Sequence, residues 1–294
     1  MLATPAAATR IANVEREIDA ARSKGPLQQI VVPPCPELLT RLQRAMAVPE
    51  PDLNDVARIA NADVAMAATL IRNANGALYA SGPPVASAGQ AMNRLGLRQT
   101  AAILTGFLAR HAIPVSSPQL QRFWERSGKR ALAMSFIAGQ LPGLSADLAY
   151  SYGLFSHVGM PVLMQSVRGY AGTMVEGMAR KDRSFVATEN ANHRTDHAVV
   201  GALTARVWRL APAVVAAIRL HHSLESLGED GTEPEVHTLV AAGLLADYFA
   251  MRHEGLSPDS DWGAHGHEAL QWLQASDDDL VHWEEQLRPV LDAG

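Results

Sequence analysis

Apolar residues along this chain of 294 residues recur every three or four positions, and the alternation typical of β-strands is nearly absent. One predicted helix buries Leu53, Val56 and Ile59, and another buries Val199 and Leu203. A chain of this length can bury roughly three quarters of the surface that its unfolded form exposes. It therefore needs neither a metal nor a disulfide to fold. The sequence predicts an all-α protein.

Proline-rich breaks divide the helical pattern. Pro33–Pro36 predicts an extended entry into a first helical bundle. Ser117 can cap the next bundle's opening helix, with Pro118 at the first helical position. The predicted parts are an N-terminal helix and linker (1–29), an N-terminal helical bundle (30–115), a second helical bundle (116–254), and a tail with a terminal helix (255–294). We expect the two bundles to pack together.

Local signals place further helix ends in the second bundle. Gly159-Met160-Pro161 is expected to bend the chain, and Thr195 is expected to cap a helix that runs from Asp196 to Arg209. Pro212 is suited to begin a helix that ends at His221-His222. These signals predict two further helices, one that begins at Asp196 and one that ends at His221-His222.

Charge and hydropathy narrow the classes of partner. The net charge is −5, and basic residues occur in small groups such as Lys129-Arg130. Nucleic-acid binding usually rests on clustered positive charge, so we expect no nucleic-acid partner. The longest apolar stretch, Leu239 to Ala246, is far shorter than the ~20 residues of a membrane helix, and the amino end lacks a basic leader. We expect a cytoplasmic protein without a membrane partner.

Five segments, in order, resemble the HDOD (HD-related output domain) family, a catalytically degenerate relative of HD and HD-GYP phosphohydrolases. Each is short and mostly apolar, but their order and spacing extend from about Ile30 to about His222. The segments are Val32–Leu39, Leu70–Tyr79, Ala91–Leu97, Asp196–Gly201 and His221-His222. The resemblance implies that the second bundle is HD-like.

The chain departs from the HD pattern at the residues that carry chemistry. HD phosphohydrolases use histidines and aspartates on adjacent helices to hold metal ions that activate water. Where they carry a His-Asp dyad, this chain has Ser156-His157. The first family histidine corresponds to Arg126 or Ser127. The candidate former active-site cavity therefore comprises Arg126, Ser156, His157, His197, His221, His222 and Asp247.

Two interpretations of the histidines remain open. In the favoured one they are inherited polar positions that now bond to backbone or water, because buried polar groups need partners with or without a metal. No cofactor and no catalytic residue is then expected. In the other, His157, His197 and one of His221 or His222 converge as a three-histidine zinc site. Any metal ligands would come from these four histidines.

The resemblance implies a bacterial signal-transduction module that regulates without turnover. It would bind other signalling proteins, or a small-molecule or nucleotide signal, through the groove between the bundles or the histidine-lined former cavity. One alternative is a residual metal-dependent phosphohydrolase that acts on a nucleotide or cyclic dinucleotide. Another is a nucleotide-binding sensor without turnover. The oligomeric state is left open.

Overall fold

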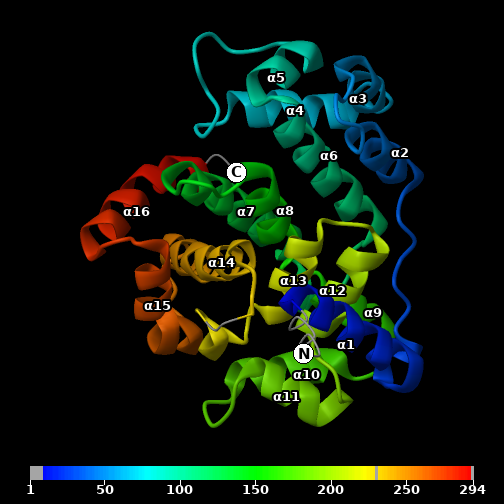
Figure 1. Ribbon diagram of the computed structural model, residues 1–294, viewed down its shortest axis with the longest axis vertical. Coiled ribbons are helices and arrows are strands. Elements are labelled where there is room, and N and C mark those ends of the chain that lie inside the picture. The colour runs from blue at the N-terminus through cyan, green and yellow to red at the C-terminus, as the bar shows by residue number, and fades with distance from the viewer. Residues whose placement is uncertain (1–8, 229–230, 293–294) are drawn as a thin grey trace, which may run out of the picture. The chain divides into compact units, whose positions relative to one another are not determined.

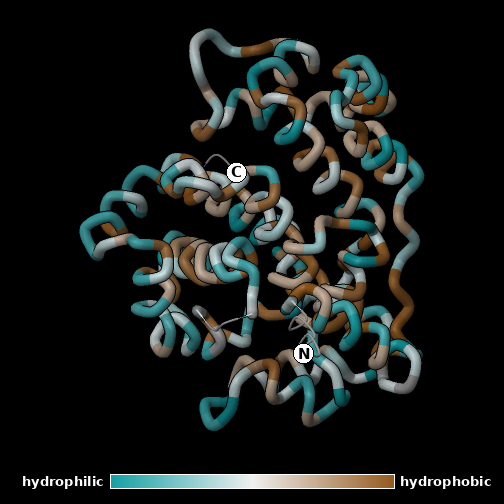
Figure 2. Tube along the Cα trace, in the orientation of Figure 1, coloured by the Kyte–Doolittle hydropathy of each residue, from teal (hydrophilic) through white to brown (hydrophobic). Residues whose placement is uncertain are grey.

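The computed structural model describes residues 9–228 and 231–292, and within them all regular structure is helical, without a β-strand (Figure 1). The predicted all-α fold is confirmed. Figure 2 shows hydrophobic and hydrophilic residues interleaved along the helices, as expected when one face of each helix is buried. None of the helices in these residues combines the length and the apolar character needed to cross a membrane.

The chain forms two compact units, and neither is a single continuous stretch. The first unit combines the described residues up to Val32 with Phe155–Leu245 and Pro258–Ala275. The second combines Pro33–Leu154, Ala246–Ser257 and the described residues from Ser276 onward. The boundary falls inside two helices, α8 (Ala146–Phe155) and α14 (Pro234–His253). The four linear parts expected from the sequence stay predictions.

The second unit holds the helices that follow the proline-rich segment. In it, α4 packs against α5 and α6, and α7 packs against α16. Its elements are α2 (Glu37–Met46), α3 (Leu53–Ala60), α4 (Val64–Asn75), α5 (Ala88–Leu95), α6 (Leu97–Ala112), the 3-10 turn η2 (Pro118–Leu120), α7 (Phe123–Gln140), α16 (Asp277–Asp292), most of α8 and the end of α14.

Two sequence expectations in this unit are wrong. Leu53 is exposed because it is the first residue of α3, whereas Val56 and Ile59, one turn later, are buried as predicted. Ser117 does not cap a helix. Its hydroxyl bonds to the side chain of Gln119, and Pro118 begins only a short 3-10 turn before α7.

The first unit gathers segments from both ends of the chain. Its helix α12 packs against α9 and α13, and α1 lies beside α12 and α13 (Figure 1). Phe155 and Trp208 are fully buried and meet edge to face. Its elements are α1 (Arg10–Lys24), η1 (Pro26–Gln29), α9 (Gly159–Ser166), α10 (Tyr170–Ala179), α11 (Phe185–His193), α12 (His197–Val207), α13 (Pro212–Leu220), η3 (Leu224–Ser226), α15 (Ser260–Leu273) and the start of α14.

The bend predicted at Gly159-Met160-Pro161 is displaced toward the amino end. The turn comprises residues 156–158, and α9 already begins at Gly159. Pro161 is tolerated because backbone N–H groups in the first turn of a helix have no intrahelical acceptor.

Helices α10 and α11 were not predicted. The tail forms two helices, and Gln274 adopts the left-handed conformation at the end of α15.

Helices α9 and α12 approach each other backbone to backbone at Gly159. A Cβ at this position would lie 2.0 Å from the carbonyl oxygen of His197 and 2.7 Å from the amide nitrogen of Gly201. On the neighbouring side, a Cβ on Gly201 would meet the Ile218 side chain of α13 at 3.1 Å. Only hydrogen at Gly159 permits this contact, which fixes the turn before α9 against the start of α12.

We expect Gly159→Ala to lower the free energy of unfolding by about 1–3 kcal/mol or more, because the added methyl group must push two backbones apart. Urea denaturation of the purified chain measures this change. Gly172→Ala is the matched control, since a Cβ at Gly172 in α10 meets nothing within 4 Å. The control should be neutral or gain up to ~1 kcal/mol from helix propensity. Equal stability of the two variants would contradict the packing argument.

Candidate functional site

His157 lies in the turn between α8 and α9, two residues before the close contact at Gly159. The Val158 and Met160 amides close this turn by donating to the carbonyls of Phe155 and His157. Because Gly159 lies against the backbone of His197, the side chain of His157 is brought to the amino end of α12. A local turn and one glycine contact thus position the first histidine.

His197 is the first residue of α12 and is completely buried. The cap is Asp196, whose carboxylate accepts from the Val199 amide at 2.9 Å and from the Asn190 side chain at 2.7 Å. The prediction that Thr195 caps a helix beginning at Asp196 is therefore wrong by one residue. The backbone of Asp196 is extended, and its carboxylate accepts from the first-turn amide of Val199. The buried hydroxyl of Thr195 has no hydrogen-bond partner among the described residues.

His221 and His222 follow directly on α13, which begins at Pro212 as predicted. The Nδ1–H of His221 donates to the Ile218 carbonyl at 2.6 Å, which holds the ring against the end of its own helix. The Nδ1–H of His222 donates to the Asp261 carboxylate at 2.8 Å. His221 and His222 are neighbours in the sequence, and the centroids of their rings lie 4.1 Å apart.

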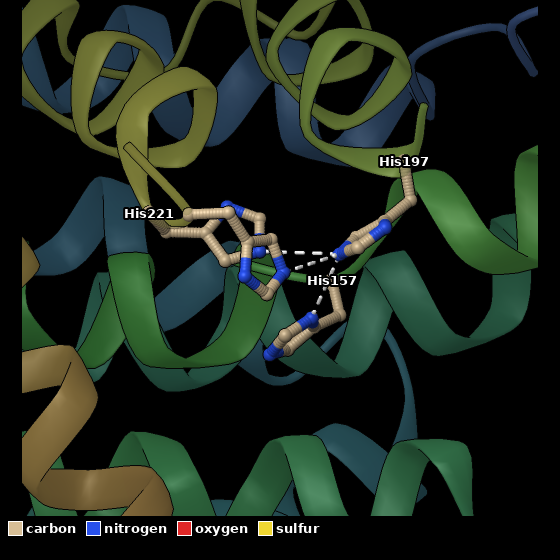
Figure 3. A group of neighbouring side chains, drawn as sticks. His157, His197 and His221 are labelled. Carbon is tan, nitrogen blue, oxygen red and sulfur yellow. Dashed lines mark hydrogen bonds between the residues drawn. The ribbon is translucent and has the colours of Figure 1, made fainter. Parts of the chain in front are cut away.

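The four histidines converge within the first unit. His197 is central, because its Nε2 lies 3.2 Å from Nδ1 of His157, from Nε2 of His221 and from Nε2 of His222. One ring nitrogen from each histidine lies within 4.8 Å of all the others. Figure 3 shows the labelled rings of His157, His197 and His221 pointing toward one another from separate segments.

A buried carboxylate holds His197 from behind. Glu189 of α11 is fully buried, and its Oε2 accepts from Nδ1 of His197 at 2.7 Å and from the His197 backbone amide at 3.2 Å. Its other oxygen accepts from the Tyr170 hydroxyl. The Tyr170 pKa is raised well above its ordinary value, first by burial and then by the charge of Glu189, so the hydroxyl keeps its proton and donates.

These outer partners determine which nitrogens face the centre with a lone pair. A carbonyl or carboxylate oxygen only accepts, so Nδ1 carries the hydrogen in His197, His221 and His222. A ring of this tautomer, when neutral, has its acceptor lone pair on Nε2. Three Nε2 lone pairs are consequently directed toward one small volume. Two acceptor nitrogens do not bond to each other directly, so a proton or a metal cation between them is needed to hold the rings together.

Burial disfavours a proton on His221. Its pKa is lowered well below the ordinary histidine value, first by burial and then by the neighbouring His222, His157 and His197. The ring is buried and its nitrogens face only the Ile218 carbonyl and other imidazoles. The chemistry of this donor set therefore suits a cation that binds neutral imidazole nitrogen.

The family model for the HDOD domain matches residues 32–224. The chain belongs to the HDOD family. A curated relative, an uncharacterized protein of Treponema pallidum (strain Nichols), is 26% identical over 216 residues. The match covers 72% of this chain but 42% of that relative, so the chain spans less than half the length of this curated relative.

Two solved structures share the fold. A protein of Shewanella amazonensis SB2B named "Putative metal-dependent phosphohydrolase" is 19% identical, with a TM-score of 0.67 over 96% of this chain and 99% of that one. A "Putative signal transduction protein" of Marinobacter aquaeolei VT8 is 18% identical, with a TM-score of 0.68 over 97% of this chain and 66% of that one. At 18–19% identity, these two neighbours show that the helical fold is shared.

The remaining candidate residues of this HDOD chain have other surroundings. Ser156 is buried in the same turn as His157. Arg126 and Asp247 belong to the second unit, where Arg126 bonds to Glu254 at 2.7 Å and Asp247 bonds to Arg130 at 2.5 Å. Among the described residues, the group able to hold a metal consists of the four histidines, without either of these two residues.

Two residues that orient the site were not found from the sequence. Glu189 lies on α11, in a segment for which no helix was predicted, and Asp261 lies in the first turn of α15. Neither belongs to an HD motif. The sequence signal for Glu189 is weak: a carboxylate in the stretch Phe185–His193, which follows Ser184, a residue type that caps helices. No local pattern links Asp261 to His222, which lies 39 residues earlier.

We expect Glu189→Ala to lower the free energy of unfolding by about 3 kcal/mol or more, because it leaves three buried donors without an acceptor at ~1–3 kcal/mol each. Those donors are the Tyr170 hydroxyl and two N–H groups of His197. Chemical denaturation followed by circular dichroism measures the loss. Glu268→Ala, at an exposed carboxylate of α15, should unfold like the unmodified chain. A Glu189→Ala variant of unchanged stability would be incompatible with this network.

Proposed function

We propose that this HDOD chain is a regulatory module that acts by binding signalling proteins or a small signal and does not turn over a substrate. The observation that carries the proposal is the identity of the residue after Ser156. An HD phosphohydrolase has an aspartate there, and this chain has His157, whose Nδ1 lies 3.2 Å from Nε2 of His197.

This replacement changes the chemistry that the cluster can perform. Hydrolysis assisted by a metal needs a coordination position that is open to water. With His157 in place, four imidazoles surround the centre, and two of them, His197 and His221, are buried. Four nitrogen ligands complete the tetrahedral shell that zinc adopts in structural sites. The donor set supports a site that is closed to a reacting water.

Fold similarity also supports a role in signalling. The family match covers most of the two helical units, and one neighbour is named as a signal transduction protein. A fold can persist after its chemistry has been lost, so the site decides between the candidate functions. The half-buried rings of His157 and His222 form the accessible part of the cluster. A ligand or partner that senses the cluster would contact these two rings.

A residual metal-dependent phosphohydrolase is the second candidate. It is favoured by the convergent histidines and by the name of the Shewanella amazonensis neighbour. In this alternative a nucleotide or cyclic dinucleotide would displace one histidine from the centre. The two candidates therefore differ in a measurable property, which is release of product.

We expect no metal-dependent release of product from phosphate esters, nucleotides or cyclic dinucleotides when manganese, iron or zinc is supplied to the purified chain. Turnover that depends on the metal and is lost in both His197→Ala and His221→Ala would overturn the regulatory proposal. His282→Ala is the control, because this exposed histidine of α16 bonds to Gln286 within its own helix. Contaminating activity would persist in all three variants.

Binding without turnover is tested with the same variants. A thermal-shift panel of nucleotides and cyclic dinucleotides should identify a small signal, and pull-down from the native cell should identify protein partners. We expect a specific ligand or partner to be lost in His157→Ala and kept in His282→Ala. Ligands and partners that bind every variant equally would contradict a role for the histidine cluster.

A further inference from the structure

We infer that His157, His197, His221 and His222 form a closed, all-nitrogen site for a divalent d-block cation of the zinc class. The inference deepens the proposed function and rests on it, because it assigns the cluster a bound ion that organises the module instead of activating water. Three observations carry it: the spacing of the nitrogens, their outer hydrogen bonds, and the separate segments from which they come.

The nitrogen spacing fits tetrahedral coordination. Zinc binds histidine nitrogen at about 2.0–2.1 Å, so neighbouring nitrogens around a tetrahedral ion lie about 3.3 Å apart. Three distances from Nε2 of His197, to His157, His221 and His222, are each 3.2 Å. The whole set of four ligand atoms lies within 4.8 Å. Tetrahedral coordination requires the longer pairs to close to the same spacing.

The outer hydrogen bonds fit a metal site as well. Histidines that bind metals almost always donate their other N–H to a carboxylate or a carbonyl, which fixes the tautomer and the ring orientation. Glu189, the Ile218 carbonyl and Asp261 accept from Nδ1 of His197, His221 and His222, respectively. A histidine cluster that served only as core packing has no need for every one of these rings to present Nε2 inward.

The ligands come from three segments of the first unit, and this gives the ion a structural role. His157 belongs to the turn before α9, His197 begins α12, and His221-His222 follow α13. An ion at the centre would connect all three, and through the bond from His222 to Asp261 it would also hold the start of α15. Occupancy of the site should therefore raise the thermal stability of the first unit, since a ligand that binds only the folded form stabilises it.

The donor set also predicts which ions bind. Neutral imidazole suits zinc, cobalt, nickel and copper, whereas magnesium, calcium and manganese prefer carboxylate, carbonyl and water oxygens. No carboxylate belongs to the described group of candidate ligands. We expect zinc and cobalt to bind far more tightly than magnesium or manganese, the opposite of a site built from aspartates.

The test uses the full, tag-free chain, stripped with a chelator and titrated with zinc by calorimetry and with cobalt(II) by visible absorption. We expect one ion per chain, the visible bands of tetrahedral cobalt(II), and a rise in the unfolding temperature on adding zinc. His157→Ala and His222→Ala should each weaken zinc binding at least as much as loss of an outer partner does, about 10–100-fold. His282→Ala should bind like the unmodified chain.

Asp261→Asn keeps the test valid if a histidine variant fails to fold, because it alters only the half-buried partner of His222. It should weaken zinc binding about 10-fold or more while circular dichroism stays unchanged. A chain that binds no zinc, or whose zinc binding is the same in His157→Ala, His222→Ala and Asp261→Asn, would overturn the inference. The regulatory proposal survives that result, whereas zinc binding accompanied by phosphoester turnover would overturn both the regulatory proposal and the closed coordination, because hydrolysis needs an open position on the metal.

Discussion

The contact between Gly159 and the backbone of α12 is the constraint on which the candidate site depends. Without a side chain at this position, the carbonyl oxygen of His197 and the amide of Gly201 come within 2.0 and 2.7 Å of where a Cβ would be. Two helices that touch backbone to backbone leave the turn before α9 no freedom to move away from α12. The position of His157 next to His197 follows from that contact, and Ile218 on Gly201 brings α13 and its two histidines to the same place.

Electrostatics then decides what the cluster can bind. Glu189 and Tyr170 form a buried chain of hydrogen bonds that ends on Nδ1 of His197, and Asp261 and the Ile218 carbonyl act in the same way on the other two rings. Each outer acceptor directs a lone pair inward. In the proposed site, His157 supplies a fourth nitrogen at the position where an HD phosphohydrolase has an anionic oxygen, which would favour closed coordination over water activation.

Much of the secondary structure could be predicted from local signals. The start of α13 at Pro212 and the burial of Val56 and Ile59 in α3 are confirmed, because proline and apolar periodicity act within one or two turns. The errors also have local causes. Asp196 caps α12 in place of Thr195, Leu53 points outward at the first position of α3, and α10 and α11 were not predicted although both are regular helices.

The sequence by itself determined that the chain is all-helical, that it resembles HDOD proteins, and that Ser156-His157 replaces a His-Asp dyad. Those conclusions depend on residue type and spacing along the chain, which are one-dimensional properties. Only the tertiary structure decided that four histidines meet, with Glu189 and Asp261 behind them, while Arg126 and Asp247 pair with Glu254 and Arg130. Residues 157, 197 and 221 are separated in the sequence by several helices. They meet because α9 and α12 approach closely at Gly159, and this contact depends on packing between distant segments, which no local sequence pattern encodes.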